Sequence, residues 1–94
     1  MKAEWNGAVV AESDSTIELG GYHYFPRDAV RMELLRSVPR SEHDLECPHG
    51  VRFFDVVDGE QEAVRAAWTY EAPRPSHQAI DHWIGFWKEV RLAP

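Results

Sequence analysis

Turn-forming dipeptides that contain glycine divide this chain into short extended runs, and no other feature constrains its fold as much. Asn6-Gly7 predicts a β-hairpin, because a type I′ turn needs positive φ at both of its central residues. Gly20-Gly21 and Asp58-Gly59 each separate two further runs. The predicted strands are Ala3–Trp5, Ala8–Ala11, Thr16–Leu19, Tyr22–Phe25, Val30–Leu35, Arg52–Val57, Glu62–Tyr70 and Trp83–Leu92. The chain is therefore predicted to be mainly β, with antiparallel pairing.

Helical segments are predicted to be one or two in number and short. Pro26 precedes Arg27-Asp28-Ala29, and a proline at the first helical position with an acid in the opening turn favours a single helical turn. Ser76 can cap a second short helix that begins at His77. The polar segment Ser37–Gly50 is interpreted as a loop, and loops of this length inside small domains are often functional.

Length and charge limit the class of protein to which this chain can belong. Ninety-four residues provide one hydrophobic core, so we expect a single domain over residues 1–94. The net charge of −6, from sixteen acidic and ten basic residues, disfavours nucleic acid and anionic membranes as partners. Cys47 is the single cysteine and excludes an intramolecular disulfide. Met1-Lys2 continues without a signal-peptide pattern, so a cytoplasmic location is predicted.

Four stretches together carry a resemblance to a known family. They are Tyr24–Met32, Cys47-Pro48-His49-Gly50, Trp68–Pro73 and Phe86-Trp87. In their order and spacing they resemble the domain-of-unknown-function family 427, which is also labelled nucleotidyltransferase-like. The resemblance runs from the Asn6-Gly7 hairpin to Phe86-Trp87 and implies a bent antiparallel sheet of the Mss4-like or β-tent type. It implies no established activity, and the four-cysteine zinc sites of some relatives in that wider group cannot form here.

The nucleotidyltransferase label finds no support in the residues. Metal-dependent nucleotidyl transfer needs paired carboxylates, commonly two residues apart on a strand, but Asp28 is followed at that spacing by Val30. No Gly-x-x-x-x-Gly-Lys phosphate loop is present. His43, Cys47 and His49 match the spacing of zinc ligands only loosely. We therefore predict neither a metal site nor a bound cofactor.

A small-molecule or anion-binding module is the preferred functional hypothesis. Arginine offers a bidentate fork for carboxylate or phosphate, tyrosine adds a hydroxyl, and alternate aromatic residues of a strand can form an apolar wall. The predicted ligand-binding residues are Tyr24, Arg27, Asp28, Arg31, Trp68 and Tyr70. The alternative is that Arg31 pairs internally with Asp28 or Glu33, while the aromatic residues are ordinary core.

Two other hypotheses stay open, and with them the question whether the protein is an enzyme. A cysteine-dependent enzyme would use Cys47 as nucleophile with His49 or His43 as its base. The alternative for Cys47 is a small buried side chain that anchors the loop. A protein-interaction role, including a homodimer, would use apolar surface left over among Trp83, Phe86 and Trp87.

Overall fold

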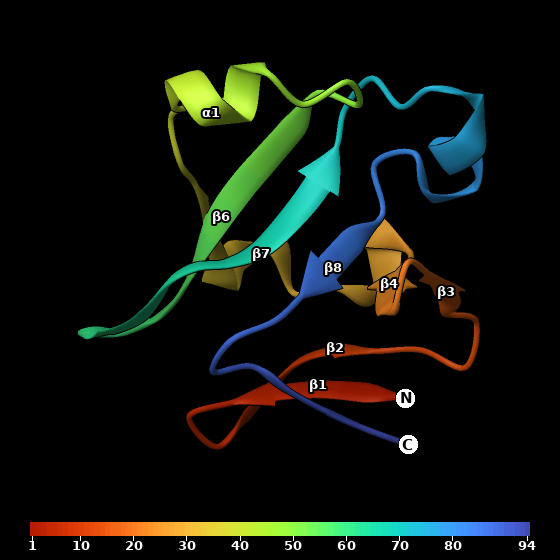
Figure 1. The fold of residues 1–94 in the computed structure, drawn as a ribbon. Helices are drawn as coiled ribbons and strands as arrows, with labels where there is room; N and C mark the ends of the chain where they lie inside the picture. Colours follow the sequence, from red (N-terminus) through yellow and green to blue (C-terminus); the bar gives the residue numbers. More distant parts are fainter.

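The computed structural model describes residues 1–94, and the chain forms two antiparallel sheets (Figure 1). The strands are β1 (Lys2–Trp5), β2 (Ala8–Glu12), β3 (Ile17–Leu19), β4 (Tyr22–Phe25), β5 (Leu35–Ser37), β6 (Val51–Asp58), β7 (Gln61–Tyr70), β8 (Ile84–Phe86) and β9 (Arg91–Ala93). The helical segments are α1 (Glu42–Leu45) and the 3₁₀ turns η1 (Arg27–Ala29), η2 (Met32–Leu34) and η3 (Pro75–Ile80). The mainly β prediction is confirmed.

The strands divide between a large sheet and a small one. The large sheet has the order β3-β4-β8-β7-β6-β5, and the small sheet has the order β2-β1-β9. The first four strands therefore do not form one continuous meander, because β1 and β2 belong to the small sheet. The strand predicted over Trp83–Leu92 is also two strands, β8 and β9, one in each sheet. No helical segment has the length and apolar character needed to cross a bilayer.

The main hydrophobic core lies between the two sheets. Ala3 and Val10 of the small sheet pack with Phe25, Val56 and Phe86 of the large sheet, and all five are buried. Alternate residues of the large-sheet strands point away from this core, to what we call the outer face. A second cluster with Tyr24, Trp68 and Ile80 occupies that face.

The segment between β4 and β6 differs from its prediction. Val30 forms only an isolated bridge to Ala11, the chain then turns through η2, and β5 begins at Leu35. The predicted loop contains α1, which a reciprocal capping box stabilises. Asp44 N donates to Ser41 Oγ at 3.1 Å, and Ser41 N donates to the Asp44 carboxylate at 3.0 Å. In Figure 1, α1 lies beside one end of β6.

The hairpin β6–β7 contains a bulge that sets the register of the outer face. Pairing shifts between Phe54 and Val56, where Arg65 adopts a positive φ of 53°. The Asp55 carboxylate accepts the Arg65 N–H at 2.8 Å, which satisfies the donor that the bulge removes from the ladder. Before the bulge, Val64 is 52% exposed.

Candidate ligand-binding site: an aromatic cavity

One row of residues crosses four strands on the outer face of the large sheet. Gly85 in β8 pairs with Tyr24 on one side and with Trp68 on the other, and Trp68 pairs with Phe53. A Cβ atom at Gly85 would lie 2.7 Å from Cζ2 of Trp68 and 3.0 Å from Cε2 of Tyr24. Only glycine therefore leaves the space into which the Trp68 indole extends.

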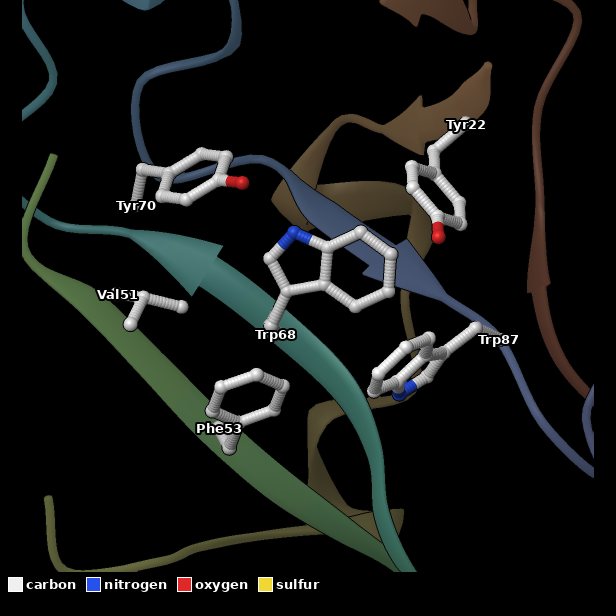
Figure 2. Close-up of a pocket in the computed structure, with 6 residues that line it drawn as sticks. All are labelled: Tyr22, Val51, Phe53, Trp68, Tyr70 and Trp87. Atoms are coloured by element: carbon white, nitrogen blue, oxygen red, sulfur yellow. The ribbon is translucent and has the colours of Figure 1, made fainter. Parts of the chain in front are cut away.

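A cavity of about 170 Å³ opens beside this row (Figure 2). We call it the aromatic cavity, and it is lined by Tyr22, Val51, Phe53, Trp68, Tyr70 and Trp87. Strand alternation explains the lining: β6 and β7 each contribute two residues that are two positions apart, and these form the cross-strand pairs Phe53–Trp68 and Val51–Tyr70. Tyr22 comes from β4, and Trp87 directly follows β8.

Three of the rings meet at near-right angles. The interplanar angle is 85° between Tyr22 and Trp68, 84° between Tyr22 and Trp87, and 72° between Trp68 and Trp87. Their centroids lie 5.1, 6.5 and 5.7 Å apart in the same order, which is edge-to-face contact. Trp87 is also fixed through its Nε1, which donates to the backbone oxygen of Arg65 at 2.7 Å. The three rings therefore restrict one another's movement at one side of the cavity.

Polar atoms at the cavity wall are few and neutral. Trp68 is 5% exposed, and its Nε1 is buried without a hydrogen-bond partner. In Figure 2 this nitrogen lies on the side of the ring toward Tyr70. Burial, and then the neighbouring Tyr70, raise the pKa of Tyr24 well above its ordinary value, so its hydroxyl keeps its proton. The wall therefore offers hydrogen-bond donors but no charge.

A second, larger cavity of about 420 Å³ adjoins the first, since both are lined by Val51, Phe53 and Tyr70. We call it the acidic cavity, and its remaining lining residues are His43, Asp44, Glu46 and Cys47. Neither lining contains a lysine or an arginine. The two cavities together thus run from an aromatic end to a polar end with two carboxylates.

Arg65 contacts a lining residue of each cavity. Its guanidinium donates to the Asp44 carboxylate at 2.6 Å and lies 4.0 Å from the centre of the Phe53 ring. This hydrogen bond is the main cause that holds the pKa of Asp44 below its usual range. Asp44 is 3% exposed, so α1 is attached to the large sheet by a buried carboxylate.

Of the six predicted ligand-binding residues, the structure brings three to the aromatic cavity. Trp68 and Tyr70 line it, and Tyr24 packs against both of them, with ring centroids 5.8 and 6.3 Å away. Arg27, Asp28 and Arg31 do not line it.

These three residues have other surroundings. Arg27 donates to the backbone oxygen of His82 at 3.2 Å, and Asp28 is exposed. Arg31 forms an exposed ion pair with Glu33 at 3.0 Å, and Glu33 is one of the two internal partners considered for it in the sequence analysis.

The structure does not assemble Cys47 and His49 into a pair. Nδ1 of His49 accepts the backbone N–H of Arg74 at 3.0 Å, and its ring stacks on His77 with centroids 3.9 Å apart. Burial, then the neighbouring His77 and Arg74, lower the pKa of His49. Cys47 is half-buried and lines the acidic cavity together with His43. His49 therefore acts as a neutral hydrogen-bond acceptor that holds the chain near Arg74.

Sequence reasoning missed Tyr22, Val51, Phe53, Trp87 and Gly85. Trp87 and Tyr22 were visible as aromatic residues, and Val51 and Phe53 alternate as cavity-lining strand residues do. Nothing in the sequence specifies which of them lie opposite Trp68, because that depends on the bulge at Arg65.

The fold and the site define this protein as a mainly β domain with an aromatic cavity on the outer face of its large sheet. A protein-family model for the domain of unknown function DUF427, named NTP_transf_9, matches residues 1–93, and the chain belongs to this family. The predicted membership of this family is thereby confirmed. No curated protein matches the chain. No group of three or more His, Cys, Asp or Glu side chains is placed to hold a metal ion.

Proposed function

We propose that this domain binds a small molecule in the aromatic cavity. The observation that carries the proposal is that five aromatic rings from four segments of the chain surround a space that they do not fill. The space of about 170 Å³ is open to solvent on one side, so a ligand can reach the aromatic rings from the surface. Ligand pockets are typically apolar and aromatic, with a few polar groups that orient the ligand.

The size and chemistry of the cavity limit which ligands it can accommodate. A dry cavity of about 150 Å³ accommodates a molecule the size of benzene, so the aromatic cavity suits a group of one ring or one branched alkyl head. The adjoining acidic cavity can receive a polar extension of the same molecule. The arginines predicted for anion binding lie elsewhere, so the proposal is for an apolar or cationic ligand group.

The test is a titration followed by NMR with phenol, indole and choline as probes. The indole N–H resonances of Trp68 and Trp87 report directly on the cavity. We expect at least one probe to shift both resonances saturably. If none of the three does so at millimolar concentration, the proposal is wrong.

Two variants connect any binding to the cavity. Val51→Phe places extra volume into both cavities and should abolish binding, whereas Tyr22→Ala removes one wall and should weaken it. Tyr22 is 41% exposed, so its loss should cost less stability than the loss of a buried ring. Val64→Ala truncates an apolar side chain of similar exposure outside the cavity and serves as the matched control. Binding that survives Val51→Phe in a folded protein would contradict the assignment.

A further inference from the structure

We infer that the ligand carries a methylated ammonium group, which the aromatic cavity receives as a cation. This inference rests on the proposed function, since it names the class of molecule that the same cavity binds. Three observations lead to it: the mutual angles of the rings, the charges around the two cavities, and the cations that already lie over two of the rings.

The ring angles favour a rounded group over a flat one. A planar aromatic ligand gains most from parallel rings above and below it. Tyr22, Trp68 and Trp87 are instead mutually near-perpendicular, at 85°, 84° and 72°, so a flat ligand can stack on one of them only. A trimethylammonium group is nearly spherical and presents a methyl group to each wall. Binding of such cations by perpendicular aromatic walls is a known use of the cation–π interaction.

The charges around the cavities select a cation. No lysine or arginine lines either cavity, and the acidic cavity contributes the carboxylates of Asp44 and Glu46. Arg65 neutralises Asp44, whereas the only partner of Glu46 is His43, 3.6 Å away and exposed to solvent. The whole chain carries a net charge of −6, which raises the local concentration of cations.

The protein already uses two of these rings to bind cations. The Arg65 guanidinium lies 4.0 Å from the centre of Phe53, and the Lys88 ammonium lies 5.1 Å from the centre of Trp87. The rings of Tyr22, Trp68 and Tyr70 have no such internal partner. Tyr22 is 41% exposed and offers the most accessible of these rings, whereas Trp68 is 5% exposed and contributes only the part of its ring that lines the cavity. The positive charge of Lys88 is expected to oppose binding of a cation.

The decisive experiment compares choline with 3,3-dimethylbutan-1-ol, which has the same shape but carries carbon in place of the charged nitrogen. We expect choline to bind about tenfold more tightly, because a desolvated cation–π contact contributes roughly that much. Equal or tighter binding of the alcohol would overturn the ammonium inference while leaving the aromatic cavity as a small-molecule site. If neither they nor phenol nor indole bind, the proposed function itself is wrong.

Lys88→Gln supplies an independent test of the charge. Removing this ammonium should strengthen choline binding by about twofold to threefold at low salt and leave binding of the alcohol unchanged. Lys2→Gln in β1 removes the same charge from the small sheet and is the matched control. An identical response of choline and the alcohol to Lys88→Gln would contradict the inference, because shape alone would then account for binding.

Discussion

Replacing Gly85 with alanine tests whether the Trp68 ring is held where the cavity requires it. The added Cβ would lie 2.7 and 2.8 Å from two atoms of the indole and 3.0 Å from Tyr24, distances that require one of the groups to move. The indole has little freedom to do so, because Tyr22, Tyr24 and Trp87 all contact it edge-to-face.

The expected cost follows from two opposing effects. Overpacking of a buried site typically costs about 1–3 kcal/mol. The lower backbone entropy of unfolded alanine offsets about 0.5–1 kcal/mol of this. The two effects leave a net cost of about 0–2.5 kcal/mol. Because the indole has little freedom to move, we expect Gly85→Ala to lower the free energy of unfolding by about 1–2 kcal/mol, which corresponds to a fall in Tm of about 5–15 °C for a domain of this size.

Urea unfolding followed by circular dichroism measures this change. A double-mutant cycle with Trp68→Phe identifies its cause, because the smaller ring does not reach the new Cβ. The double variant should be more stable than the sum of the two single effects predicts, by about 1 kcal/mol. Additive effects, or a Gly85→Ala protein as stable as wild type, would refute the proposed contact.

Two further predictions concern the surroundings of the cavity. The pKa of Asp44 is lower in the folded protein than in the unfolded chain, chiefly because Arg65 donates a hydrogen bond to it. The ionised Asp44 therefore contributes its full stabilisation above its unfolded pKa near 4, and this stabilisation is lost as the pH falls through its folded pKa. Asp44→Asn should lower the free energy of unfolding at pH 7 by about 1–3 kcal/mol and flatten its decline in acid, and an unchanged acid limb in a urea series would contradict this. His49→Gln should leave the rate of Cys47 alkylation by iodoacetamide unchanged, because His49 is held by Arg74; a clear loss of rate would restore His49 as a base.

The parts of the fold that short-range chemistry decides were predictable from the sequence. Asn6 and Gly7 have φ values of 53° and 78°, as the predicted hairpin turn requires. The alternation of Trp68 and Tyr70 in β7 also correctly placed two cavity residues on one face. In each case the deciding interactions lie within a few residues along the chain.

The parts that long-range pairing decides were not predictable. A regular hairpin through Asp58 would align Phe53 with a residue other than Trp68, and the bulge at Arg65 produces the observed pair. That bulge is stabilised by Asp55, ten residues away, and no local sequence pattern predicts it. Gly85 likewise has a role only because β8 lies between β4 and β7.

The arginines show why composition alone pointed toward an anion. Arg27, Arg31, Arg36 and Arg40 lie close together in the sequence, and such a cluster by itself favours a cationic site. In the folded chain Arg36 binds Asp55 and Glu62 at 2.8 and 2.6 Å, and Arg40 binds Glu71.

An acidic chain supplies a carboxylate for most arginines, and folding neutralises them in pairs, of which one, Arg65–Asp44, includes a residue that lines a cavity. Glu46 is therefore the lining carboxylate without an arginine partner, and its charge, set against that of Lys88 over Trp87, leads to the expectation of a cationic ligand.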